Sequence, residues 1–440
     1  MLMRILFWIF ILCSSANCFA EDKIIIDNLQ SLKTYAESHS ANFKNANESV
    51  LLATYTRIAS QWGVVNLTGN ANASMLDNVN LQQSFVPAEF FGGKPGTFKT
   101  VTFGQQYVSN LTFNPQLDII NPSLWARIST AKANENLSKA NRLLTKRNLL
   151  ESVAAAYYNV LNYQEQLEAS RKLLNNNDSL VLIFSHKFDE GLIRQQDLNN
   201  IEANRLLIAD KVQQLQNQIA IQIGILKGLC DISTSTQIQF TEALSAIPFS
   251  NQAEVLQASS TLLTLQSCMQ ERYQYRILKA DQLWILPNIS VVSNFNIQQN
   301  TNNHFFDNQK VYFSNYYGLR LSMPIVPDVN KIANVRNDRI NWQMARNNAQ
   351  HAALQDSINN RQLELEYDKS FNTWRNTLAI ERLKEDSYQR NLNIFREGAL
   401  SSFELISSLN EFLNAKLNTQ SAAAAYQYAK ARIIIQNTIQ

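Results

Sequence analysis

The chain has 440 residues, with 39 lysines and arginines against 36 acidic residues, and a formal charge of +3. This small basic excess argues against a nucleic-acid-binding protein, because few cations would be left to neutralise phosphates. Glycine (11) and proline (8) are both scarce. Since both residues interrupt regular structure, their scarcity favours long unbroken elements over a loop-rich enzyme.

The N-terminus has the pattern of an export signal. Arg4 precedes an apolar run from Ile5 to Cys13, and Ala20 supplies the small residue that cleavage needs. We therefore expect residues 1–20 to be a signal peptide. Acylation of Cys18 as a lipoprotein is the alternative, but its upstream context departs from the usual lipoprotein pattern. No later apolar run approaches the ~18–20 residues of a membrane-spanning helix.

Four segments alternate between apolar and polar residues, which is the pattern of β-strands with two different faces. The expected strands are 64–75, 100–114, 288–298 and 310–323. Their apolar rows are led by Val65, Val101, Ile289 and Val311. Each segment has the ~10 residues that a tilted strand needs to cross a bilayer. If the apolar rows face lipid, Arg320 belongs to the opposite row and faces the lumen of a barrel.

Tryptophans stand next to three of these segments. Trp62 and Trp284 precede the first and third, and Trp125 follows the second. Such positions are typical of the aromatic girdle of a membrane barrel, although tryptophans also occur at the edges of soluble domains. Four strands cannot close a membrane barrel, which needs about eight or more, and an open edge cannot persist in lipid. The barrel interpretation therefore requires several copies of the chain.

Two long stretches without proline, 123–247 and 328–440, each contain one glycine in a similar setting. The related segments are Phe188-Asp-Glu-Gly191 with Leu198, and Phe395-Arg-Glu-Gly398 with Leu405. Apolar residues at heptad spacing on both sides predict coiled-coil packing, and each glycine predicts a helical turn near 188–198 or 395–405. We infer a duplication, with repeats at 21–247 and 248–440.

This ordered set of features resembles the TolC family of outer-membrane factors over essentially the whole mature chain. Leu286-Pro287-Asn288 before the third strand and Pro324-Ile325-Val326-Pro327 after the fourth also match. The resemblance implies a mainly α fold with a small membrane β part, built from a duplicated β-β-α repeat with long coiled-coil helical hairpins. Four strands per chain would contribute to a trimeric twelve-stranded barrel, continued by an α-helical periplasmic tunnel.

The resemblance also implies a function. The protein would be a homotrimeric channel in the outer membrane of a Gram-negative-type bacterium, a passive export duct for efflux or type I secretion. A periplasmic adaptor and an inner-membrane transporter would be its partners. The adaptor would dock on the hairpin tips. The tip residues are Phe188, Gly191, Leu198, Phe395, Gly398 and Leu405.

The gate matches the family only in part. Asp197 matches an aspartate of the first return helix, and Glu404 matches one of two pore carboxylates, whereas Ser407 replaces the other. Phe395 and Leu400 stand where the family has Tyr and Arg. Arg194 and Arg396 are candidates for substitute ion pairs. The simpler alternative for all these charged positions is a solvated helix end.

Several functions find no support in the sequence. The four histidines are too dispersed to suggest a metal site, and no phosphate-binding loop or catalytic motif is present, so we expect neither an enzyme nor a cofactor. The main alternative to a channel is a periplasmic coiled-coil scaffold or adaptor without a pore. A diffusion porin is disfavoured by the long helices. Helix arithmetic separates Cys230 and Cys268 by ~20 Å, which predicts two free thiols.

Overall fold

The computed structural model describes residues 23–247, 261–307, 310–326 and 328–439. The expected signal peptide and Cys18 lie outside these ranges. Among the helices within them, none combines the length and apolarity needed to cross a membrane. The chain forms two compact units. The first comprises Met1–Val50, Ser138–Ser267 and Asn348–Gln440, and the second comprises Leu51–Leu137 and Cys268–Asn347. Each unit takes segments from both sequence repeats, so the repeats and the compact units are different divisions of the chain.

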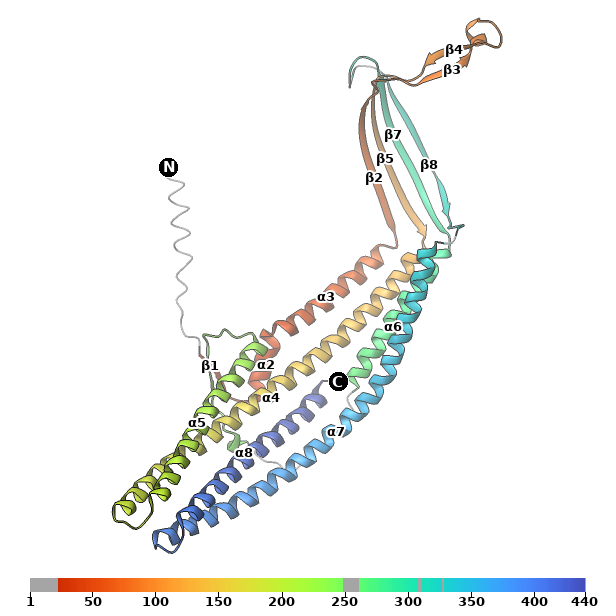
Figure 1. The fold of residues 1–440 in the computed structure, drawn as a ribbon. Helices are drawn as coiled ribbons and strands as arrows, with labels where there is room; N and C mark the ends of the chain where they lie inside the picture. The colour runs from red at the N-terminus through yellow and green to blue at the C-terminus, as the bar shows by residue number, and fades with distance from the viewer. Residues whose placement is uncertain (1–22, 248–260, 308–309, 327, 440) are drawn as a thin grey trace, which may run out of the picture. The chain divides into compact units, whose positions relative to one another are not determined.

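The second unit contains an antiparallel four-stranded sheet in the order β2-β5-β7-β8 (Figure 1). The strands are β2 (Asn66–Asp77), β5 (Tyr107–Ile120), β7 (Asn288–Thr301) and β8 (Val311–Ser322). The central β5–β7 pair joins the two sequence repeats. Within the described chain, β2 and β8 have a partner on one side only, so both edges of the sheet are open.

Four helical segments of the second unit adjoin the strands. The helices that contribute them are α3 (Ala41–Trp62), α4 (Pro122–Asp189), α6 (Leu262–Gln282) and α7 (Val329–Arg396), and the short 3₁₀ turn η4 (Leu283–Ile285) follows α6. Among the tryptophans expected beside the strands, Trp62 ends α3, Trp125 lies in the first turn of α4 and Trp284 lies in η4. All three therefore lie close to strand ends.

The expected second strand is wrong in its first half. Residues 98–102 form a separate strand, β4 (Phe98–Thr102), which pairs with β3 (Gln83–Pro87) in a hairpin that also holds the 3₁₀ turn η2 (Ala88–Phe91). The alternation of the sequence continues across this boundary, but Gly104 has a φ of 108° and interrupts the extended backbone. Val101 thus belongs to the side hairpin, and the apolar row of β5 begins at Tyr107.

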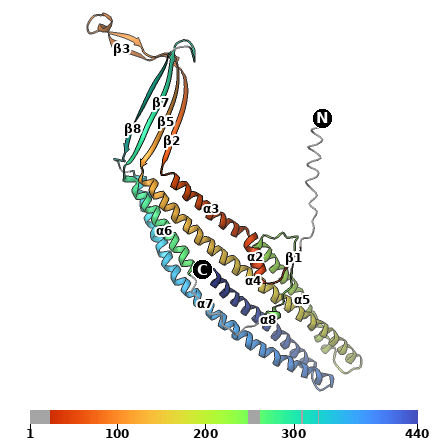
Figure 2. The same ribbon diagram turned by 180° about the vertical axis from the view of Figure 1, so that it is seen from behind.

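The first unit contains two long helical hairpins (Figure 2). The far part of α4 pairs with α5 (Gln195–Cys230), and the far part of α7 pairs with α8 (Ser402–Thr438). Both outgoing helices, α4 and α7, have 68 residues, and the return helices have 36 and 37. This near-identity of length agrees with the duplication seen in the sequence.

Small elements that the sequence pattern did not reveal complete the first unit. They are α2 (Leu29–His39), the parallel strands β1 (Lys23–Ile26) and β6 (Gln237–Phe240), and the 3₁₀ turn η3 (Leu244–Ala246). They pack on a core that includes Tyr157, Leu161 and Cys230. Cys230 and Cys268 are both free thiols. Burial raises the pKa of the Cys230 thiol to about 11, and the neighbouring Asp231 adds to this effect.

Candidate channel surface and hairpin tips

The strand pairing sorts the sheet residues onto two faces of different chemistry. Residues that face each other across neighbouring strands lie on the same side of a sheet. One such row is Leu67, Leu117, Val291 and Leu319, and another is Ala73, Leu111, Ile297 and Phe313. Except for Leu117, which lies beyond the expected strand 100–114, these residues belong to the alternation that the sequence identified as apolar. This face of the sheet is therefore predominantly aliphatic and aromatic.

The opposite face is covered by polar side chains that bond across the strands. Asn66, Asp118, Ser290 and Arg320 form one row, and Asn72, Thr112, Asn296 and Ser314 form another. The hydroxyl of Thr112 donates to Asn296 over 3.2 Å, and Asn294 donates to Asn114. The polar face is mostly uncharged amide and hydroxyl groups.

Arg320 lies on this polar face, opposite Ser290 in the pairing of β7 with β8. Its guanidinium donates to the side-chain oxygen of Gln116 over 3.4 Å, and the amide of Gln116 donates to Asp118 over 3.0 Å. The sequence had placed Arg320 in the polar row, and the register agrees with that placement. Two hydrogen bonds through Gln116 thus connect Arg320, the one arginine of β8, to the carboxylate of Asp118 on β5.

The two hairpin turns have the same backbone geometry. At the end of α4, the N–H of Leu192 donates to Lys187 O and that of Gly191 to Phe188 O. At the end of α7, Ala399 and Gly398 donate in the same way to Ile394 and Phe395. This is the Schellman arrangement, which requires a positive φ at its glycine. Gly191 and Gly398 have φ values of 74° and 82°, as their sequence context predicts.

A shared apolar core holds the two turns together. Phe184 of the first hairpin stacks on Phe395 of the second, with ring centroids 5.0 Å apart. Lys187 lies over the same ring and donates to the carbonyl oxygen of Phe395 over 3.2 Å. Phe395 and Leu405 are only 3% and 0% exposed. These two tip residues therefore serve to join the hairpins, and their side chains offer no surface to a partner.

The two carboxylates predicted to lie at a gate, Asp197 and Glu404, stand at the starts of the return helices. The Asp197 carboxylate accepts from the backbone N–H of Arg194 over 3.2 Å. Glu404 accepts from the backbone and the hydroxyl of Ser401, and the same hydroxyl accepts from the backbone N–H of Glu404. Glu404 thus completes a reciprocal capping box, whereas Asp197 makes only the backbone half of one. Each carboxylate has a local structural role.

The charged residues around the turns are largely open to solvent. Arg194, Arg396 and Glu404 are exposed, and Asp197 and Ser407 are half-buried. In the part of the chain that the structure describes, neither arginine forms an ion pair with Asp197 or Glu404. The substitute pairs suggested by the sequence are therefore absent from a single copy of the chain.

Known proteins resemble this chain in structure and not in sequence. No family model matches the sequence, and no curated protein matches it. The Campylobacter jejuni CmeC outer membrane channel aligns with a TM-score of 0.75 at 15% identity, over 93% of this chain and 85% of that chain. The outer membrane protein VceC of Vibrio cholerae gives 0.66 at 14% identity, over 93% and 96%. The open-state MtrE outer membrane channel of Neisseria gonorrhoeae gives 0.70 at 13% identity, over 93% and 88%.

The fold that the resemblance implied for one chain, long helical hairpins with a small β part, is confirmed over nearly the whole chain. The chain has the TolC fold.

Within this TolC fold, apolar packing occupies positions where the resemblance implied polar partners. Phe395 is buried in the tip core and Leu400 packs against it. A gate that depended on hydrogen bonds at these two positions is excluded by their side chains. In this chain the corresponding contacts between hairpins are aromatic and aliphatic.

Sequence reasoning missed the apolar residues that the tips expose. Leu192, in the turn of the first hairpin, is 66% exposed, and Phe403, in the first helical turn of α8, is 74% exposed. Leu198, which was expected to contact a partner, instead packs partly against the tip core. Two features of the sequence could have revealed Leu192 and Phe403. Both residues lie beside the start of a return helix, and neither belongs to the heptad pattern that predicts burial.

Proposed function

We propose that this chain is an outer-membrane channel, a passive export duct that acts as a homotrimer. The observation that carries the proposal is a four-stranded sheet with one apolar face, one polar face and two open edges. In lipid an unpaired strand edge leaves backbone groups without partners, which is unfavourable. Edge β2 of one copy would therefore pair with edge β8 of the next, and three copies would close a barrel of twelve strands.

The two faces of the sheet give the barrel its orientation. The apolar rows would contact lipid, and the amide-rich rows, with Arg320, would line the lumen. Trp62 is 79% exposed and Trp125 is 48% exposed. Together with Trp284 they would form the girdle at one membrane interface. The solved structures with this fold include proteins described as outer membrane channels, which supports a channel rather than an enzyme.

The hairpin end would dock a periplasmic adaptor of a tripartite efflux or type I secretion machine that includes an inner-membrane transporter. The exposed side chains of Leu192 and Phe403 suit such an apolar contact, and the half-buried Phe188 adds apolar surface at the first hairpin. The capped carboxylates Asp197 and Glu404 would, in three copies, place acidic groups around the pore at this end. Energy for export would come from the transporter.

Conductance and membrane location test the proposal. The purified protein should be extracted from the outer membrane only with detergent, as a trimer, and should form discrete conductance steps in a planar bilayer. Leu319→Arg puts a charge on the apolar face and should cost ~2–4 kcal/mol of barrel stability near the bilayer centre. Arg320→Leu, its neighbour on the polar face, should assemble normally and change ion selectivity.

Two results would contradict this assignment. A soluble protein without conductance would favour the scaffold or adaptor alternative. Normal assembly of Leu319→Arg together with failed assembly of Arg320→Leu would mean that the faces are reversed.

A further inference from the structure

The excess of positive charge is concentrated in the helical segments of the second unit. Residues 51–62, 122–137, 268–282 and 329–347 carry ten lysines and arginines against four acidic residues. The helices of the first unit carry 22 against 19. A chain that is nearly neutral overall therefore has one strongly basic region. Because local charge decides which ions gather at a surface, this region differs in chemistry from the rest of the protein.

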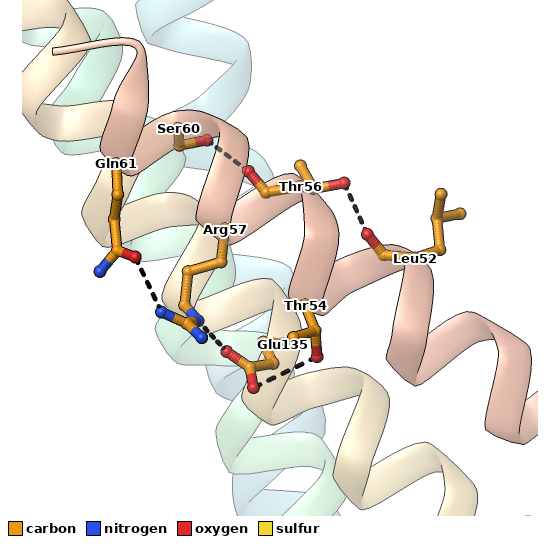
Figure 3. A network of polar contacts seen from close by, with 7 residues as sticks. All are labelled: Leu52, Thr54, Thr56, Arg57, Ser60, Gln61 and Glu135. Carbon is orange, nitrogen blue, oxygen red and sulfur yellow. Dashed lines mark hydrogen bonds and ion pairs between the residues drawn. The ribbon is translucent and has the colours of Figure 1, made fainter. Parts of the chain in front are cut away.

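Most of the few carboxylates in this region are already neutralised or paired with each other. Glu135 of α4 accepts from the guanidinium of Arg57 on α3 over 2.5 Å and from the hydroxyl of Thr54 over 3.4 Å (Figure 3). Arg57 also donates to Gln61, one turn later on α3 (Figure 3). The charge of Glu135 is therefore neutralised by Arg57, on the side of α4 that faces α3.

The aspartates of the region face each other. Asp338 of α7 lies beside Asp281 of α6, and desolvation together with this like-charged neighbour raises the pKa of Asp338. One of its carboxylate oxygens is buried without a hydrogen-bond partner. A hydrogen bond between the two side chains contributes to the raised pKa of Asp338, so this pair favours holding a proton and carries less negative charge than two separate carboxylates.

Three of the nine remaining cations line a groove between α4 and α6. It has a volume of about 370 Å³, and its charged lining residues are Lys132, Arg272 and Arg276. Neutral donors stand among them, namely the hydroxyls of Ser129 and Tyr275 and the amide of Asn136. No carboxylate lines the groove. In the described chain these three cations have no ion-pair partner.

The helical spacing explains why these side chains meet. Ser129, Lys132 and Asn136 lie one turn apart along one stripe of α4, and Arg272 and Arg276 lie one turn apart on α6. The ring of Tyr275 is held by Trp342 of α7, with centroids 5.7 Å apart, and Lys279 lies over the same ring. The two stripes therefore face one groove, and one of its hydroxyl groups is held in position by packing.

We propose that this groove binds a phosphate or sulfate group. Two guanidinium groups offer pairs of N–H donors that match the oxygens of such an anion, and the ammonium of Lys132 adds a further positive charge. Hydroxyl and amide donors satisfy the remaining oxygens. The proposal rests on the second unit alone and does not depend on the channel function.

Binding of inorganic phosphate to the purified full chain in an uncharged detergent tests the site. Phosphorus NMR should show saturable binding on the order of 1 mM, which weakens as sodium chloride is added because the contacts are ionic. Arg272→Gln combined with Arg276→Gln should weaken it about tenfold or more, because two charge-assisted contacts are lost. The matched control is Arg361→Gln with Arg390→Gln, which removes two α7 arginines that are 69% and 74% exposed. The control should bind phosphate like the wild type.

Equal phosphate affinity in wild type and the Arg272/Arg276 variant would overturn the proposal, as would equal losses in that variant and in the control. A second measurement identifies the source of the anion. Nanodiscs of phosphatidylethanolamine are prepared with and without phosphatidylglycerol, and the lipids that copurify are identified by mass spectrometry. A lipid headgroup predicts that the wild type retains phosphatidylglycerol and the double variant does not. Equal retention assigns the groove to a soluble phosphate or sulfate.

Discussion

The two helical hairpins share a turn but differ in how their return helices are packed. Both turns have the same pair of backbone bonds, and both end in a glycine with positive φ. In contrast, α8 buries 18 residues and α5 buries six. Large apolar residues of α5 are exposed instead, among them Leu206 and Leu207 at 64% and 68%. The duplication has thus kept the backbone of the turn while the packing of the two return helices has diverged.

This difference assigns separate tasks to the two return helices. A helix with most of its apolar residues buried, such as α8, forms the core of its own chain. A helix that leaves several leucines and isoleucines exposed, such as α5, is suited to contact with another chain. In the proposed trimer, α5 would therefore be a contact helix between copies. The predictions below change matched positions in the two hairpins.

The largest difference is expected between the two tip phenylalanines. Phe395→Ala should destabilise the tip by ~3–5 kcal/mol, because it removes a buried ring that stacks on Phe184 and contacts Lys187. Phe188→Ala, at the same place in the first hairpin, should cost clearly less because Phe188 is half-buried. Hydrogen exchange of the tip peptides measures the opening free energy in each variant. Equal losses of stability in Phe395→Ala and Phe188→Ala would contradict the proposed difference between the two hairpins.

The turn glycines should behave alike. A Cβ at Gly191 or Gly398 would meet no atom within 4 Å, so a substitution there acts through the backbone alone. Valine at either position should cost ~1–2 kcal/mol or more, because a β-branched residue strongly disfavours a positive φ. Gly224→Ala is the control: this glycine lies inside α5 with free space and no positive φ. It should stabilise the helix by ~0.5–1 kcal/mol. Unequal costs at the two turns, again by hydrogen exchange, would show that they are not equivalent.

The sequence predicted the turns and the four strands of the main sheet because these depend on local signals. A glycine that follows a heptad pattern marks a turn wherever it stands, and alternation assigns each residue of a strand to a face. The boundary between β4 and β5 was missed because alternation continues across residues 103–106, where the backbone leaves the strand and Gly104 has a positive φ. The burial of Phe395 depends on Phe184, which is distant in the chain. Contacts of this kind cannot be read from local spacing.

Removing the side chain before each return helix should produce a smaller difference in stability between the two hairpins. Ser401→Ala removes the hydroxyl that bonds the backbone N–H of Glu404, which should cost ~1 kcal/mol. Arg194→Ala should have almost no effect, because the Asp197 carboxylate accepts from the backbone of Arg194 and not from its side chain. Hydrogen exchange of the helix amides near each turn measures the loss of protection in each variant and so compares the two caps. A larger loss for Arg194→Ala would show that the guanidinium has a structural role.

The smallest effect on stability is expected for Glu404→Gln, although its effect on the pore should be clear. Glutamine also completes a capping box, so unfolding should change by less than ~0.5 kcal/mol. Glu404→Ala loses the cap as well as the charge and therefore serves as the paired control. If three copies place Glu404 around the pore, loss of the charge should weaken block of the channel by cations, as measured in single-channel recordings. Equal cation block in the wild type and in Glu404→Gln would leave Glu404 with its capping role alone.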